Sequence, residues 1–211
     1  IVGRTSSSGT HSYLAYSGTV SALTDAANQK GQNAGGVIGK MQSNTVLRKS
    51  YFNGSISGRG FVGGLVGTTG VAVKIYNSYS TGFVFANSYA GGLVGNVSSY
   101  TATNCFTSSV VSTTQGYYAS LHSSGSSNIF SGVSNYYNSN LTASQTVNNN
   151  GVTGKTTQQL KTKETFSGWD FDNVWIISGN INDGFPFLRG NNELDLIDFT
   201  FIQDSSIGSL T

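Results

Sequence analysis

The stretch AGGLVG at residues 90–95 decides the fold, because two further copies of it precede it along the chain. VGGLVG occupies residues 62–67 and AGGVIG occupies residues 34–39, so the starts at 34, 62 and 90 are 28 residues apart. A block that recurs at one period indicates a structural unit stacked on copies of itself. The nine glycines of the three blocks are Gly35, Gly36, Gly39, Gly63, Gly64, Gly67, Gly91, Gly92 and Gly95.

The repeats extend beyond the glycine blocks. They divide the chain at residues 34–61, 62–89 and 90–118, followed by a degenerate copy at 119–150 in which ASLH replaces the glycine block. Leucine follows two of the glycine pairs, and an aromatic residue stands at one position of each repeat. Identical residues at each level are predicted to stack into ladders that fill a narrow core. The predicted ladder residues are Leu65, Leu93, Tyr51, Tyr79, Phe106 and Tyr137.

Within each repeat, short β-branched or aromatic segments alternate with Gly, Ser, Asn and Thr, which is the pattern of strands joined by turns. Three short strands fit one repeat, and no helical period lasts beyond one turn. We therefore expect an all-β fold, a right-handed parallel β-helix (solenoid) of about four to five rungs, covering residues 1–154. The glycine pairs are predicted to allow a sharp corner or a positive φ.

The composition favours an extracellular module. Charged residues make up 9% of the chain, against roughly 25% in an ordinary soluble domain. No Asp or Glu occurs in residues 26–163, and no Asp, Glu, Lys or Arg occurs in residues 75–154. The chain begins with Ile rather than Met, which suggests a mature or excised piece of a longer protein.

The same composition argues against three other classes of protein. With a net charge of +2 and no basic cluster beyond Arg48 and Lys49, nucleic acid is not an expected partner. No apolar run approaches the roughly 20 residues that direct membrane insertion requires. The single cysteine, Cys105, excludes an intrachain disulfide and is interpreted as a small buried hydrophobe.

A second composition, with Lys, Asp, Trp and the only proline, begins at Lys155 and defines a C-terminal cap at residues 155–190. Thr156 and Gln159 fit a capping box and predict a short helix to about Lys163. The aromatic residues of this segment are predicted to seal the open end of the solenoid. Residues 191–211 alternate like a strand and are interpreted as a tail or the start of a next module, or as a strand donated to a neighbouring copy. The principal cap residues are Trp169, Trp175, Phe185 and Pro186.

The GGLVG blocks at 63–67 and 91–95, with NSYSTGFV at 77–84, resemble the GLUG repeat of large bacterial surface proteins. Such proteins include filamentous-haemagglutinin-like adhesins and the non-catalytic parts of IgA-specific metallopeptidases. Residues 155–190 resemble the segment that closes these arrays, so the resemblance covers most of residues 34–190. It implies a solenoid architecture and a location at the cell surface or in secreted proteins, and it implies no particular ligand.

Motifs for catalysis are weak. GRGFVG at 58–63 matches a dinucleotide fingerprint, but neither a helix nor an acid about 20 residues later follows it. GGVIGK at 35–40 is one residue short of a phosphate-binding loop, and the N-terminal Ile-Val-Gly has no acid in the body to complete a protease triad. His11 and His122 are the only histidines. The only carboxylates that could form a catalytic or calcium site lie in the cap and are interpreted as solvated turn residues: Asp170, Asp172 and Asp183.

We therefore expect no catalytic residues, cofactor or metal, and a structural or adhesive function. The expected partners are a host or environmental surface, a polysaccharide, or neighbouring copies of the chain. The alternatives are a carbohydrate-active β-helix enzyme and a non-catalytic stalk of a larger surface peptidase. Sequons at Asn53, Asn96 and Asn140 permit glycosylation in a suitable host. Tyrosines that could either stack on sugars or belong to the ordinary surface or core are Tyr76, Tyr100, Tyr117, Tyr118 and Tyr136.

Overall fold

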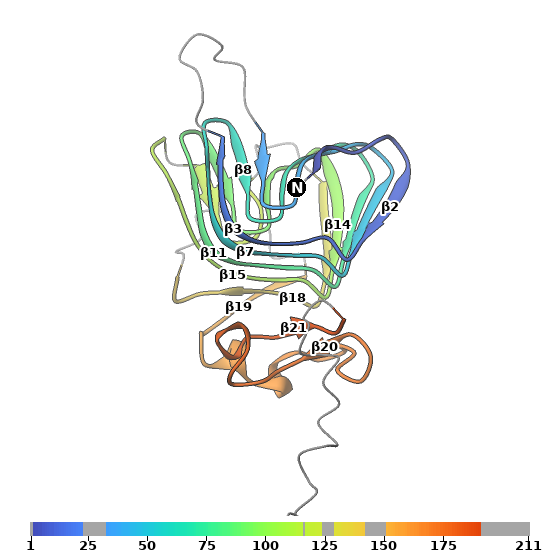
Figure 1. Cartoon of the computed structure of the whole chain (residues 1–211), viewed down its shortest axis with the longest axis vertical. Helices are drawn as coiled ribbons and strands as arrows, with labels where there is room; N and C mark the ends of the chain where they lie inside the picture. The colour runs from blue at the N-terminus through green and yellow to red at the C-terminus, as the bar shows by residue number, and fades with distance from the viewer. Residues whose placement is uncertain (1, 23–32, 116, 124–128, 142–150, 191–211) are drawn as a thin grey trace, which may run out of the picture.

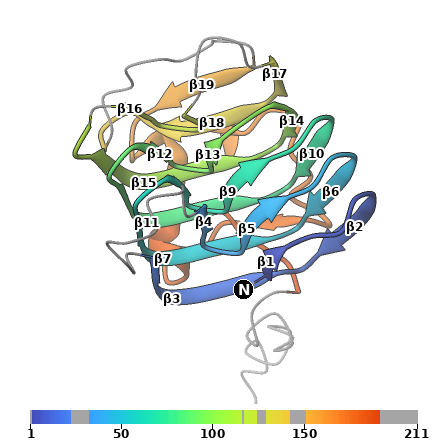
Figure 2. The same ribbon diagram turned by 90° about the horizontal axis from the view of Figure 1, so that it is seen from above.

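The computed structural model describes residues 2–22, 33–115, 117–123, 129–141 and 151–190 (Figure 1). The described chain is all-β. Its solenoid strands form four parallel sheets, in which successive turns pair with one another (Figure 2), and two short strands of the C-terminal segment form a separate antiparallel pair. The predicted parallel β-solenoid is therefore confirmed. About three turns are formed by β5–β8, β9–β12 and β13–β16, and strands β1–β4 and β17–β19 extend the same sheets on either side of them. The four to five rungs and the right-handed coil stay predictions.

We name the sheets A to D in the order in which one turn passes through them. Sheet A contains β1 (Val2–Arg4), β5 (Ile38–Met41), β9 (Val66–Thr69) and β13 (Val94–Asn96). Sheet B contains β2 (Gly9–Ser12), β6 (Thr45–Arg48), β10 (Val73–Tyr76), β14 (Ser99–Thr103) and β17 (Ile129–Val133). Sheet C contains β3 (Ala15–Ala22), β7 (Tyr51–Gly58), β11 (Tyr79–Ala86), β15 (Phe106–Thr113), β18 (Asn135–Asn138) and β19 (Val152–Lys155). Sheet D contains β4 (Ala34–Gly35), β8 (Phe61–Gly63), β12 (Tyr89–Gly91) and β16 (Tyr117–Ala119).

Each repeat contributes four strands rather than the expected three, because the glycine block separates two of them. Figure 1 shows that the outline of each turn folds inward where sheet D gives way to sheet A. The glycine block lies at the tip of this infold. There the backbone of each copy bonds to the next, with the Leu65 N–H donating to the Leu93 carbonyl at 2.9 Å and the Leu93 N–H to Leu121 at 2.7 Å. Leu65 and Leu93 are fully buried in the core.

Close backbone approach, not a left-handed conformation, explains the block glycines. None of the nine has a positive φ, so the expectation of positive φ at the block is wrong. A β-carbon on Gly63 would lie 2.5 Å from the backbone nitrogen of Gly95. One on Gly64 would lie 2.8 Å from the β-carbon of Ser80 and closer still to the Gly92 carbonyl. Real β-carbons do not approach other atoms so closely, and only glycine fits both arms of the infold.

The degenerate fourth block keeps this geometry without glycine. The Gly92 N–H donates to the Ala119 carbonyl at 3.2 Å, and a β-carbon on Gly92 would collide with the carbonyl of Ser120. The glycine pair of each block therefore makes room for the turn that follows it, whereas the third glycine of each block lies against backbone that precedes it in the chain. Among residues 117–123 and 129–141 no further copy of the block lies over Ser120, so a side chain is tolerated there.

Other corners of the coil use left-handed residues at fixed positions. Positive φ values recur between sheets A and B at Ser8, Asn44 and Ala72. They recur between sheets B and C at Tyr13, Lys49, Asn77, Asn104 and Ser134. Asparagine tolerates this conformation better than most residues, which explains its use at three of these eight positions.

Replacing Gly64 with valine is predicted to prevent stable folding. The side chain would overlap the Gly92 carbonyl and Ser80, and overlap with backbone cannot be relieved by a rotamer change, so we expect a loss of about 3 kcal/mol or more. Urea unfolding followed by circular dichroism measures this loss. Gly9→Ala is the matched control, since a β-carbon there meets nothing within 4 Å. Equal stability of the two variants would contradict the close-approach argument.

Candidate functional site

The predicted aromatic ladder lies on the outer face of sheet C rather than in the solenoid core. Tyr51, Tyr79 and Phe106 stack with ring centroids 5.0 Å apart at each step and near-parallel planes. The next residue on each strand points into the solenoid instead. In β7 this residue is Phe52, which is fully buried in the core. The interpretation of this ladder as core is therefore corrected, because a 28-residue period is the same on either face of a strand.

The fourth ladder residue is Tyr136 and not Tyr137. Strand β18 pairs Phe106 with Tyr136 and Thr107 with Tyr137. The preceding residue, Asn135, fixes this register, since its side chain accepts from the Cys105 N–H at 3.0 Å and donates to the Ala102 carbonyl at 2.9 Å. Tyr136 is buried, so of the two alternatives given for it, sugar stacking or ordinary surface or core, the second holds.

The cap packs against this ladder, on the flank of the solenoid. Figure 1 places the segment beside the outer face of sheet C, so the prediction that it seals an open end is wrong. The Trp175 ring lies 6.0 Å from Tyr79 and 6.1 Å from Phe106. The indole N–H of Trp169 donates to the Ser134 carbonyl at 3.0 Å. The cap therefore contacts side chains of three successive strands of sheet C.

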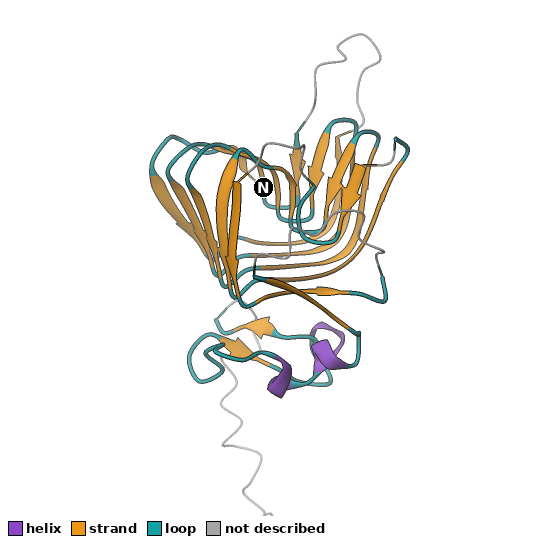
Figure 3. Cartoon of the chain, turned by 180° about the vertical axis from the view of Figure 1, so that it is seen from behind, coloured by secondary structure: helices purple, strands orange, loops and turns teal. Residues whose placement is uncertain are grey.

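The cap has little regular structure of its own. Its helices are single 3₁₀ turns, and Figure 3 shows the drawn helices confined to this segment. Thr156 and Gln159 form the predicted capping box, in which each backbone N–H donates to the other side chain, at 2.9 and 3.2 Å. The carbonyl of Pro186 accepts from the Asn182 side chain at 2.8 Å. The cap elements are η1 (Gln159–Lys161), η2 (Lys163–Thr165), η3 (Asn182–Gly184), β20 (Trp175–Ile176) and β21 (Phe187–Leu188).

A buried polar ladder runs inside the corner between sheets B and C. The Ser50 N–H donates to the Ser78 hydroxyl at 3.2 Å, and both hydroxyls donate to carbonyls two residues before them. Cys105 occupies the same position one turn later, fully buried. Burial raises the pKa of its thiol to about 12, although backbone hydrogen bonds oppose the shift. A thiol held in its neutral form is a poor nucleophile, so Cys105 is structural.

The cap carboxylates lie at the surface of the cap. Asp170 is fully exposed, and its carboxylate accepts from the Asn173 backbone N–H at 2.8 Å, which lowers the pKa of the carboxyl group. Asp183 lies apart from it, in the left-handed turn η3. Within the described ranges, no group of three or more His, Cys, Asp or Glu side chains is placed to hold a metal ion. No helix in those ranges is long and apolar enough to cross a membrane.

One histidine, His122, is buried where the chain forms a parallel bridge with Val94 of β13. His122 packs against Phe130 with ring centroids 4.6 Å apart and meets Tyr100 edge-on at 5.4 Å. Neither Nδ1 of His122 nor the Tyr100 hydroxyl has a hydrogen-bond partner among the described residues. Desolvation lowers the pKa of His122 to about 4. Tyr100 is fully buried, which agrees with the core alternative given for it.

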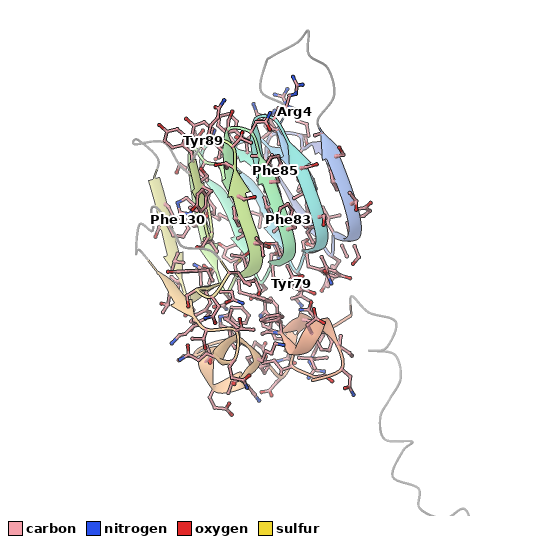
Figure 4. All side chains as sticks on the ribbon, turned by 90° about the vertical axis from the view of Figure 1, so that its left-hand side faces the viewer. Arg4, Tyr79, Phe83, Phe85, Tyr89 and Phe130 are labelled. Carbon is pink, nitrogen blue, oxygen red and sulfur yellow. The ribbon has the colours of Figure 1, made fainter. Side chains whose placement is uncertain are left out.

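Some of the exposed or half-buried aromatic residues were expected from the sequence, and two phenylalanines were not. Tyr117 is 60% exposed, while Tyr76 and Tyr118 are half-buried. Phe83 is 42% exposed and Phe85 half-buried on the outer face of sheet C (Figure 4). Neither phenylalanine stood out, because the matching positions of the other repeats hold serine, threonine or valine. Of the sequon residues, Asn53 and Asn140 are exposed and Asn96 is half-buried.

Comparison with known proteins finds one similar fold and does not show a family for this chain. No protein-family model and no curated protein matches the chain. A crystal structure of a putative immunoglobulin A1 protease from Bacteroides ovatus matches with a TM-score of 0.68 at 21% sequence identity. The match covers 86% of this chain and 57% of that one, so this chain spans a little over half of its length. At this identity the match shows a shared fold.

Replacing Trp175 with alanine is predicted to destabilise the protein by about 3–5 kcal/mol, because the buried indole fills the space between the cap and two ladder rings. Trp175→Phe should lose less, since it keeps ring contacts and removes an indole N–H that has no partner in the described chain. Denaturant midpoints measure both. Val71→Ala, at a site 57% exposed, is the control and should change stability by less than about 0.5 kcal/mol.

The protein is predicted to become less stable as the pH falls, because His122 is buried in its neutral form. Its folded-state pKa of about 4 lies below the ordinary value of 6.5, so the unfolded chain binds the proton more tightly. The stabilisation from the neutral ring is complete above pH 6.5 and is lost between pH 6.5 and 4, by about 3 kcal/mol. Urea unfolding at stepped pH measures this slope. His122→Phe should flatten the profile in that window, and an unchanged slope in the variant would contradict the assignment.

Proposed function

We propose that this chain is a non-enzymatic structural and adhesive module of a prokaryotic cell-surface or secreted protein. The observation that carries the proposal is the continuous register of the solenoid. Strand β11 pairs residue for residue with β7 and β15 over eight positions, from Tyr79 to Ala86. Such ladders resist bending and local opening, because each strand is held on both sides.

The flanking cap adds to this rigidity. By contacting Tyr79, Phe106 and Tyr136 together it links successive strands of sheet C from outside. A stiff element of this kind suits a stalk or spacer that holds other parts of a protein away from a surface. The low charge, 9% of residues, suits a role outside the cell.

The resemblance to GLUG repeats and the structural match favour one version of this role. The matched Bacteroides ovatus protein is a putative immunoglobulin A1 protease and is longer than the matching region. We propose that the present chain is a non-catalytic stalk of a comparable surface or secreted protein. Its own outward faces would then make any contact with a host surface, a polysaccharide or a neighbouring copy.

A carbohydrate-active β-helix enzyme is the alternative from a different class. β-Helix catalysis of polysaccharide cleavage depends on carboxylates or acid-bound cations, and residues 26–163 contain no acid. The acidic residues of the described cap are all exposed, namely Glu164, Asp170, Asp172 and Asp183. The non-enzymatic proposal is therefore preferred.

The proposal predicts no turnover and strong resistance to proteolysis. Incubation of the purified chain with immunoglobulin A1 and with neutral and acidic polysaccharides should release no product above a buffer blank. In parallel, native protease digestion should leave the body intact under conditions that degrade Gly64→Val, because cleavage needs open backbone. Product release that Asp170→Asn or Asp172→Asn abolishes would favour the enzyme. Digestion of both proteins at one rate would contradict the rigid-module role.

A further inference from the structure

A small aromatic platform lies on the outer face of sheet C, on the side of the solenoid that faces the viewer in Figure 4. Phe83 and Phe85 occupy alternate positions of β11, so both side chains point outward, about 7 Å apart. In the neighbouring turns, Phe83 pairs with Ser55 and Val110, and Phe85 pairs with Ser57 and Ser112. Two phenyl rings therefore stand in a row flanked by three hydroxyl groups and one valine.

The faces of these two rings are not covered by other aromatic rings of the described chain. Elsewhere on the surface, the aromatic ladder of sheet D stacks on itself, with Phe61, Tyr89 and Tyr117 at centroid spacings of 5.1 and 5.0 Å. A sugar cannot enter between rings so close together. The phenylalanines have small neighbours instead, and Phe83 is 42% exposed. The platform is thus suited to stacking in a way that the tyrosine ladder is not.

We propose that the Phe83–Phe85 platform binds a neutral glycan chain. This inference rests on the proposed adhesive function and assigns a ligand class to it. A pyranose ring presents an apolar C–H face and a rim of hydroxyls. The platform offers the complement, with phenyl faces for the C–H groups and the hydroxyls of Ser55, Ser57 and Ser112 on strands about 4.8 Å to either side.

The absence of charge selects an uncharged ligand. Strands β7, β11 and β15, which carry the two rings and their flanking residues, contain no Asp, Glu, Lys or Arg, and Arg59 follows only after the end of β7. An anionic polysaccharide or an acidic peptide would lose hydration at the platform without gaining an ion pair, which disfavours it. A folded protein partner is disfavoured by size, since stable interfaces cover roughly 800 Å² on each side and the platform holds two rings and Val110.

The solenoid also keeps the platform pre-organised. Phe83 and Phe85 stand on a strand that is paired on both sides along its whole length. Val84, between them, is fully buried in the core. Little backbone order remains to be imposed when a ligand binds, and a rigid surface loses less free energy on binding than a loop.

Affinity electrophoresis in native gels tests the proposal. The intact 211-residue chain should be retarded by at least one soluble neutral polysaccharide among β-glucan, mannan, xylan and amylose, and not by polygalacturonate. Phe83→Ala should weaken the apparent Kd about tenfold, and the double variant with Phe85→Ala should abolish retardation. Because both rings lie on the outer face, the variants should keep the wild-type denaturant midpoint.

Tyr117→Ala is the matched control, because it removes a more exposed aromatic ring outside the platform and should leave retardation unchanged. The proposal is overturned if no neutral polysaccharide retards the chain, if retardation survives the double variant, or if only polygalacturonate retards it. Loss of self-association in the double variant, with no glycan effect, would also overturn it. Glycan cleavage would contradict the non-enzymatic function while leaving the platform in place, so the two failures are distinguishable.

Discussion

Backbone contact at the glycine block is the constraint on which the rest of the solenoid depends. Sheets D and A can lie against each other at the infold only because Gly63, Gly67 and Gly95 present no side chain between them. The tip of the infold then reaches the opposite wall. A β-carbon on Gly36 would meet the ring of Phe52, and one on Gly92 would meet the side chain of Thr107. The infold therefore leaves no open channel at this level, and it sets the size of residue that sheet C can carry.

Polar residues inside the core follow from the same contact. Where the tip contacts sheet C, Ser80 of β11 and Thr107 of β15 occupy the position that Phe52 has in β7. The Ser80 hydroxyl donates to the Gly92 carbonyl and bonds to the Thr107 hydroxyl at 3.0 Å. A bare carbonyl at the tip would otherwise be buried without a partner, at a cost of about 1–3 kcal/mol. Small hydroxyl residues satisfy it and leave the space that the glycines need.

The sequence shows the 28-residue period and so predicts the parallel solenoid, but it does not predict whether a repeated side chain points into the core or outward. A 28-residue recurrence of glycine blocks in β-rich sequence is sufficient for a parallel solenoid, because only stacked turns satisfy the backbone of such short strands. The same period is silent on which face a repeated residue takes, so the ladder of Tyr51, Tyr79 and Phe106 could be placed inside or outside. From the sequence, either Tyr136 or Tyr137 could pair with Phe106. The long-range hydrogen bonds of the Asn135 side chain fix the register in which Tyr136 does so. The surface that the cap covers depends on that orientation, and it could not be derived first.

The two faces of sheet C differ in how strictly they repeat from turn to turn. Along the inward position occupied by Ile56, successive turns carry Val84 and Val111, so the core repeats one aliphatic shape. Along the outward position one residue away, the turns carry Thr19, Ser55, Phe83 and Val110, which share no common chemistry. Stacking alone would permit serine at every outward position, and it does not call for a half-exposed phenylalanine beside another. The Phe83–Phe85 row is where sheet C departs furthest from its repeat, and the proposed glycan platform offers a reason for that departure.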